Sequence, residues 1–202
     1  NIGGGGFMVY RKADGTIGAL DYREKAPLLA SKDMYLDSNG KVIPNLSVNG
    51  ALAIGVPGTI AGIFAVHEKF GKLPIEEIIK PVIALAKKGI VVTAKQEKQL
   101  QTHHDDIVRI SGNETLLAHS YKVGDTIKYP ALAETLFRIM KNGKDEFYKG
   151  ETAQKMVAFI QKTGGIISLD DLSKYEAKWR TPITFTYKDL KVISMSPPSS
   201  GG

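Results

Sequence analysis

The chain has 202 residues, of which 43% are apolar and 24% are charged, so it can fill a core and is not a disordered segment. Its longest apolar runs fall far short of the roughly 18 residues that a membrane-spanning helix needs, so no membrane span is expected. The net charge of +6 is modest and spread along the chain, which argues against nucleic-acid binding, and the lack of cysteine excludes disulfides and thiolate metal sites.

The chain opens with a predicted β-hairpin. Strand-like residues 7–11 and 17–22 flank Asp14-Gly15, a dipeptide that favours a tight turn between antiparallel strands. Residues 26–49 are polar and rich in turn formers, including Asp37-Ser-Asn-Gly40, and predict an irregular surface excursion. Residues 52–56 then return to a strand-like pattern.

Helical patterns dominate the middle of the chain. Glycines, prolines and capping residues mark their ends, at residues 58–71, 75–88, 94–103, 130–141, 151–163 and 168–172. In the second of these, Ile75, Ile78, Ile79, Val82, Ile83 and Ala86 form one predicted apolar stripe. Pro81 lies inside it, which predicts either a kink or two abutting short helices.

Residues 184–195 close the chain with two strand-like runs joined by Lys188-Asp189. The order along the chain, with strands first, then several helices, then strands, predicts an α+β fold and not a doubly wound sheet. The chain begins without Met, and it ends inside a motif. It is therefore expected to be a piece of a longer polypeptide.

Three glycine- or histidine-containing motifs suggest chemistry only weakly. Gly3–Gly6 precedes a strand instead of opening a helix, so it does not fit a phosphate-binding loop. The spacing of the glycines in 55–62 is wrong for a dinucleotide fingerprint, and tight backbone passage explains them better. His103 and His104 are adjacent on a predicted helix, point about 100° apart and cannot share one metal ion, so no metal site is expected.

Arg23 and the final turn are the remaining candidates. Arg23 lies at the end of a predicted buried strand, where its guanidinium could pair with a ligand carboxylate. A salt bridge to Asp21 or Glu24 is the alternative that the pattern alone favours. Ser199–Gly202 does not match a hydrolase nucleophile elbow, but two prolines followed by serines and glycines predict a sharp turn.

Six segments occurring in order along the chain resemble the large subunit of the γ-glutamyltranspeptidase family. They are Gly3–Met8, Asp21–Pro27, Gly55–Gly62, Asp145–Gly150, Gly164–Ile167 with Asp170–Leu172, and Ser194–Gly202. The resemblance implies an N-terminal-nucleophile hydrolase fold, a four-layer αββα sandwich of which this chain supplies only part. Residues 1–202 are then a single partial domain, a fragment of the large subunit.

The resemblance also implies an activity. In this family, a precursor cleaves itself, and the new N-terminal threonine of the small subunit attacks glutathione or another γ-glutamyl compound. The γ-glutamyl group then passes to water, an amino acid or a peptide, with no metal or other cofactor. No catalytic residue is expected in this chain, which should be inactive without its small-subunit partner.

By the resemblance, Arg23 matches the arginine that pairs with the substrate's α-carboxylate, which reverses the preference drawn from the pattern alone. Family members are usually periplasmic, secreted or on the extracellular face, and the same location is expected here. Two alternatives stay open: a related glutaryl or cephalosporin acylase, and a fragment with a purely structural or binding role.

Overall fold

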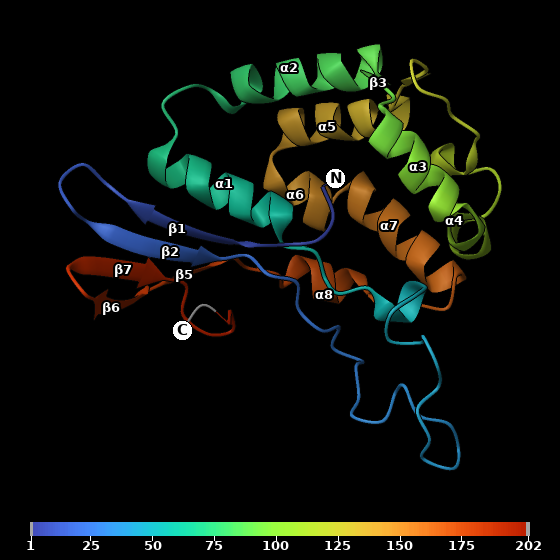
Figure 1. Ribbon diagram of the computed structural model, residues 1–202, viewed down its shortest axis with the longest axis horizontal. Coiled ribbons are helices and arrows are strands. Elements are labelled where there is room, and N and C mark those ends of the chain that lie inside the picture. Colours follow the sequence, from blue (N-terminus) through green and yellow to red (C-terminus); the bar gives the residue numbers. More distant parts are fainter. Residues whose placement is uncertain (1, 201–202) are drawn as a thin grey trace.

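The computed structural model describes residues 2–200 and combines helices with short antiparallel sheets (Figure 1), as an α+β fold requires. The strands are β1 Phe7–Arg11, β2 Ile17–Asp21, β3 Ile90–Val91, β4 Thr126–Ile127, β5 Lys178–Arg180, β6 Ile183–Tyr187 and β7 Leu190–Ser194. The helices are α1 Thr59–Phe70, α2 Ile75–Lys88, α3 Ala94–Thr102, α4 His104–Ser111, α5 Pro130–Asn142, α6 Lys144–Tyr148, α7 Glu151–Lys162 and α8 Leu169–Ser173. No helix within residues 2–200 combines the length and the apolar character that crossing a bilayer requires.

The predicted hairpin is confirmed as the start of a three-stranded antiparallel sheet in the order β1-β2-β5. β1 and β2 pair with Phe7 opposite Asp21, and Gly15 takes the positive φ of 87° that the turn needs. The central strand β2 carries the fully buried Ala19 and Leu20. β5 was not predicted, because a single tryptophan between two cationic residues is too short a run to indicate a strand.

Helix ends lie where their capping residues predicted them. Thr93 and Ser168 cap α3 and α8, each with a reciprocal capping box that satisfies backbone donors. Pro130 is the first residue of α5, where its missing N–H costs nothing. Glycines follow α1, α2 and α5. The helices α4 and α6 and the strands β3 and β4 were not predicted.

α2 corrects one prediction and resolves another. It is one helix that contains Pro81, so it does not divide into two short helices. The predicted apolar stripe is too broad, since Ile78 and Val82 are 43% and 49% exposed. Only one face, with Ile79, Ile83 and Ala86, packs in a buried cluster with residues of α5, namely Ala133, Leu136 and Met140.

The predicted strand at residues 52–56 is wrong. A 3-10 turn occupies Ala51–Ala53, and only Val56 forms an isolated bridge, with Lys25. Val56 N–H donates to the Lys25 carbonyl at 2.8 Å and Lys25 N–H donates back at 3.2 Å. Pro57 follows directly and has no N–H to extend the ladder. This bridge ties the chain before α1 to the residues that follow β2.

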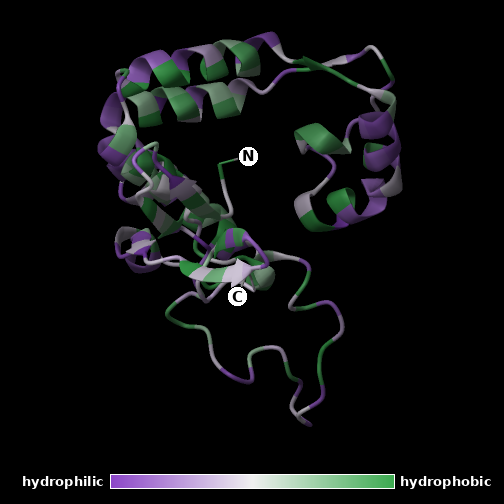
Figure 2. Cartoon of the chain, turned by 60° about the vertical axis from the view of Figure 1, so that its left-hand side comes forward, coloured by the Kyte–Doolittle hydropathy of each residue, from purple (hydrophilic) through white to green (hydrophobic). Residues whose placement is uncertain are grey.

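Residues 26–49 form the predicted irregular excursion, which projects from the rest of the chain as a long loop of mixed hydropathy (Figures 1 and 2). Its Asp37 turn is confirmed: Asp37 Oδ1 accepts from Asn39 N–H at 2.8 Å and from Lys41 N–H at 2.9 Å. The predicted assignment of residues 1–202 to a single partial domain stays a prediction.

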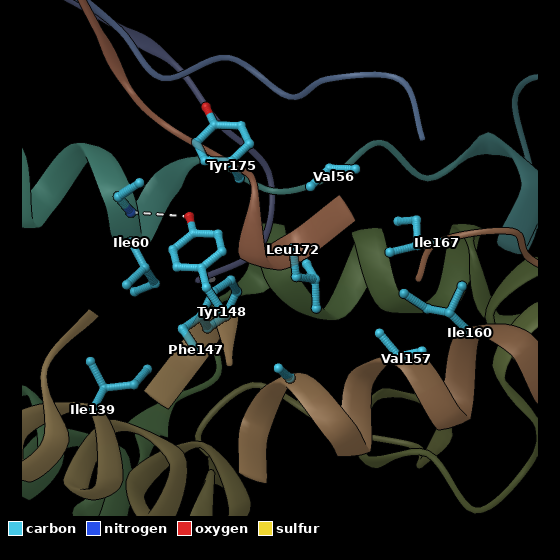
Figure 3. Packing of buried hydrophobic residues seen from close by; sticks show 12 residues of the cluster. Val56, Ile60, Ile139, Phe147, Tyr148, Val157, Ile160, Ile167, Leu172 and Tyr175 are labelled. Atoms are coloured by element: carbon cyan, nitrogen blue, oxygen red, sulfur yellow. Dashed lines mark hydrogen bonds between the residues drawn. The ribbon is translucent and has the colours of Figure 1, made fainter. Parts of the chain in front are cut away.

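The main core lies between α1 and the helices α6, α7 and α8 (Figure 3). Its largest fully buried side chain is Tyr148, at the end of α6. The ring of Tyr175 stacks on Tyr148 with centroids 5.7 Å apart and an interplanar angle of 8°. The Tyr175 hydroxyl donates to the carbonyl of Arg23, so Tyr175 connects this core to the segment that follows the central strand β2.

Candidate functional site

Two hollows are lined in part by residues of the β1–β2 hairpin and the segment that follows it, and they differ in chemistry. The larger, about 630 Å³, is lined mostly by apolar side chains of β1, α1 and α2, including Phe7, Ile63 and Phe70. His67 lies at its rim, with Nε2 2.8 Å from the Leu73 carbonyl, so its position is explained by a structural contact. The larger hollow offers few polar groups for chemistry.

The smaller hollow, about 340 Å³, is lined almost entirely by charged side chains. We call it the Arg23 pocket; its lining is Asp21, Arg23, Glu24, Lys25, Glu176, Lys178, Arg180 and Pro198. Four cationic side chains face three carboxylates, so the pocket has an excess of positive charge. A small ligand with a carboxylate and a second charged group suits such a lining.

Arg23 lies two residues after the end of β2 and has an exposed side chain. Its backbone N–H donates to Asp21 Oδ1 at 3.1 Å. Its guanidinium Nη1 donates to the Pro198 carbonyl at 3.2 Å, which joins two segments 175 residues apart. The remaining guanidinium donors face a pocket instead of a packed core, so a planar anion can approach them.

The salt bridge proposed as an alternative for Arg23 does not form. Arg180 takes the Asp21 carboxylate instead: its Nε and Nη2 donate to Asp21 Oδ2 at 2.8 Å and 2.7 Å. Among residues 2–200, no ion pair joins the Arg23 guanidinium to a carboxylate. The structure thus leaves the charge of Arg23 available for a ligand.

Lys25 belongs to the wall of the pocket. Its Nζ donates to the Glu176 carbonyl at 3.1 Å and lies 4.7 Å from the centre of the Tyr175 ring. Burial lowers the pKa of Lys25, and the nearby charge of Lys178 lowers it further. Lys25 is thereby engaged with backbone and ring atoms.

Tyr175 precedes the lining residue Glu176, and its hydroxyl donates to the Arg23 carbonyl at 2.7 Å. Burial raises the pKa of Tyr175 above its ordinary value, and the neighbouring Tyr148 and Asp21 raise it further, so the hydroxyl keeps its proton. Tyr148, stacked below it in Figure 3, donates to the Pro57 carbonyl at 2.9 Å and accepts from Ala61 N–H at 3.1 Å.

The interpretation of the glycines as sites of tight backbone passage is confirmed. Gly58 N–H donates to the Gly4 carbonyl at 2.7 Å, so the first glycine run packs against the start of α1. A side chain at Gly58 would meet the Tyr22 carbonyl and the Tyr175 hydroxyl, and one at Gly62 would meet the Tyr22 ring. Both glycines therefore allow α1 to approach the residue before Arg23.

The other sequence candidates lie away from this pocket or at its rim. His103 ends α3, and His104 begins α4 with Nε2 3.1 Å from the Ala118 carbonyl. The part of the chain that the structure describes, residues 2–200, has no group of three or more His, Asp or Glu side chains placed to hold a metal. The final turn begins at the rim, where Pro198 accepts from Arg23; its Gly201 and Gly202 lie outside the described residues.

Sequence reasoning found Arg23 and the turn that contains Pro198, but it missed Tyr175 and Arg180. Their signals are weak, because each contacts Arg23 or Asp21 across more than 150 residues of chain. A single tyrosine or arginine in a polar stretch gives no sign of such a partner. The pairing of β5 with β2 brings Arg180 to Asp21.

Comparison with known proteins gives a consistent result. The sequence profile described as gamma-glutamyltranspeptidase matches residues 1–202. A glutathione hydrolase proenzyme of Pseudomonas aeruginosa is 45% identical over 205 residues, which are 100% of this chain and 36% of that relative. The crystal structure of Helicobacter pylori gamma-glutamyltranspeptidase matches with a TM-score of 0.94 at 42% identity, over 99% of this chain and 58% of that chain.

A more distant match concerns the fold alone. Cephalosporin acylase from Bacillus halodurans is 24% identical and matches with a TM-score of 0.83, over 98% of this chain and 38% of that chain. The expected N-terminal-nucleophile hydrolase fold is confirmed, and this chain supplies part of it. The chain spans 36% of the length of the curated relative from Pseudomonas.

Proposed function

The chain belongs to the gamma-glutamyltranspeptidase family, and on this premise we propose that it is a large-subunit portion of a γ-glutamyltransferase and glutathione hydrolase. The whole enzyme cleaves glutathione and other γ-glutamyl compounds and transfers the γ-glutamyl group to water, amino acids or peptides. The name "glutathione hydrolase proenzyme" borne by its relatives supports both the activity and a precursor that is processed.

One observation carries this proposal: the guanidinium of Arg23 has no carboxylate partner among residues 2–200 and faces a charged pocket. A γ-glutamyl donor carries an α-carboxylate beside an α-ammonium group. The planar fork of Arg23 suits the carboxylate, and Glu24 and Glu176 of the same lining complement the ammonium group. Arg23 is therefore our candidate for a substrate-binding residue.

The chemistry itself is assigned to a partner polypeptide. We propose that the precursor cleaves itself and that the N-terminal threonine of the small subunit becomes the nucleophile. Its hydroxyl oxygen bonds to the γ-carbonyl carbon of the donor, and the amine leaves with a proton. Water or a second amine then attacks the ester and releases the threonine. This chain supplies the binding of the glutamyl end, and no cofactor is required.

The substrate test uses the full-length protein and two anilide donors. A γ-glutamyl anilide and a glutaryl anilide share the terminal carboxylate and differ by the α-ammonium group. We expect the γ-glutamyl compound, and glutathione, to be cleaved with a kcat/KM about 100-fold above that of the glutaryl compound, as for the loss of one charged contact. Preference for the glutaryl donor would identify an acylase, and cleavage of neither would overturn the proposal.

Two further proposals concern the whole protein. Processing is tested by following the purified precursor on a denaturing gel: it should divide into two chains that remain associated, with threonine at the new N-terminus. We also propose a periplasmic, secreted or extracellular-face location, as is usual in the family. Fractionation of the source cells should place the activity outside the cytoplasmic fraction, and recovery in that fraction would contradict it.

A further inference from the structure

The main chain of Arg23 is held on both of its polar groups. Its N–H donates to Asp21 Oδ1 at 3.1 Å, and its carbonyl accepts from the Tyr175 hydroxyl at 2.7 Å. Its side chain makes one further contact, with the Pro198 carbonyl. An arginine side chain has several rotatable bonds, and movement of its backbone would add to that freedom. Fixing the backbone therefore narrows the range of positions that the guanidinium can adopt.

The first support, Asp21, is itself fixed. Asp21 is 9% exposed and divides its two oxygens between partners: Oδ2 accepts from Arg180 Nε and Nη2, while Oδ1 accepts from Arg23 N–H. Arg180 is in β5, which pairs with β2. The ion pair thus fixes the Asp21 carboxylate relative to the sheet, and the carboxylate in turn holds the Arg23 N–H.

The second support, Tyr175, is fixed by the core. Its ring is 4% exposed, stacks on Tyr148, and is covered by Lys25 on the pocket side. The ring cannot turn without losing the stacking contact, so its hydroxyl stays directed at the Arg23 carbonyl. The phenol keeps its proton at neutral pH, as an ordinary tyrosine does, and burial raises its pKa further.

We propose that Tyr175 and the Asp21–Arg180 ion pair are positioning residues that hold Arg23 in the geometry needed to bind the donor's carboxylate. This inference rests on the proposed function of Arg23 and extends it to three residues that do not touch the substrate. Binding geometry of this kind must be kept to within about 0.5 Å, which a free loop does not achieve.

The central experiment is Tyr175→Phe in the full-length enzyme. This change removes one hydroxyl and keeps the stacked ring. We expect KM for a γ-glutamyl anilide to rise about fivefold, the equivalent of one neutral hydrogen bond, with kcat within about twofold of the wild type. In an Arg23→Ala background, Tyr175→Phe should cause no further rise, because the residue on which it acts is gone.

Tyr148→Phe is the matched control. It alters the other ring of the same stack, but the hydroxyl it removes contacts Pro57 and Ala61 and not Arg23. It should lower stability and leave KM unchanged. An equal rise in KM in both variants would mean that the effect is only loss of packing, and the positioning role would be wrong.

Arg180→Lys tests the other support while retaining a positive charge beside the buried carboxylate. It loses the two-donor contact of Nε and Nη2 with Asp21. KM should rise by about three- to tenfold, and Arg180→Met should raise it further. If Arg180→Met does not fold, Arg180→Lys and Tyr175→Phe still decide the question.

A second measurement does not depend on activity. Hydrogen exchange of the Arg23 amide in the full-length protein should be faster in Tyr175→Phe and Arg180→Lys than in Tyr148→Phe. Unchanged exchange overturns the positioning role whatever the activity. If the two variants exchange faster but the wild-type protein cleaves no γ-glutamyl donor, the positioning role is correct and the proposed function is wrong.

Discussion

Two arginine sites in this molecule use the same groups for opposite purposes. The first, the Glu146 cluster, consists of Glu146 with Arg138, Asn142 and Thr152; the second is the Arg23 pocket. Glu146 is 5% exposed and accepts from Arg138 Nε at 3.1 Å, from Thr152 N–H at 3.1 Å and hydroxyl at 2.8 Å, and from Asn142 at 3.3 Å. Arg23 is exposed and has one carbonyl partner.

The difference lies in how completely each charge is satisfied. The Glu146 carboxylate is buried with both oxygens hydrogen-bonded, and it joins α5, α6 and α7. Most of the donors of Arg23 remain unused, and its neighbours hold its backbone instead of its charge. A buried, fully bonded charge stabilises a fold, whereas an exposed charge on a fixed backbone can bind a ligand.

The largest expected effect on stability comes from breaking the Glu146 cluster. Glu146→Ala removes the acceptor of four hydrogen bonds and leaves Arg138 with the distant Glu151, 3.8 Å away. We expect a loss of about 3 kcal/mol in the free energy of unfolding of the full-length protein. Urea denaturation measures it; KM of the remaining folded enzyme should not change. A loss below about 0.5 kcal/mol would contradict the structural role.

Arg23→Ala should have the reverse profile. KM for γ-glutamyl donors should rise about 100-fold, as for the loss of a charge-assisted bidentate contact, while the urea midpoint stays near that of the wild type because the side chain is exposed. Arg23→Lys, which keeps the charge but not the planar fork, should recover only part of the affinity. An unchanged KM in Arg23→Ala would refute the assignment.

A smaller effect distinguishes the two sites by pH. Burial alone raises the pKa of Glu146, but the hydrogen bonds from Thr152, Asn142 and Arg138 outweigh burial and place that pKa below its ordinary value of 4.5. The resulting stabilisation is complete above pH 4.5 and is lost as the pH falls through the lowered pKa. Urea midpoints of the wild type should therefore fall more steeply below that pH than those of Glu146→Gln. Parallel curves would contradict this.

The smallest expected effect comes from Lys149→Ala. Lys149 pairs with Asp145 at 3.1 Å, next in sequence to Glu146, but both side chains are more than half exposed. Removing this pair should change the free energy of unfolding by no more than about 0.5 kcal/mol. A loss as large as that of Glu146→Ala would show that the helix α6 region depends on ion pairing in general and not on burial.

Local features of the fold were predictable because their causes are local. Asp14-Gly15 specifies a turn, Thr93 and Ser168 cap helices, and Pro130 begins one, and each acts on neighbouring residues. The strand predicted at 52–56 failed because an apolar run does not show whether a partner strand exists. The predicted width of the apolar stripe on α2 was wrong for a similar reason. α5 covers only one face of α2, and Ile78 and Val82 lie outside that face.

By itself, the sequence determined the first hairpin, the capped ends of the longer helices, the candidate Arg23 and a resemblance to one family. Only the tertiary structure decided that Asp21 pairs with Arg180 and not with the Arg23 side chain. It also decided that Tyr175 binds the Arg23 carbonyl and so holds its backbone. These contacts join residues more than 150 positions apart, and they depend on distances and directions set by the packing of β5 on β2. No local sequence pattern specifies such distances, because residues so far apart in the chain become neighbours only when it folds.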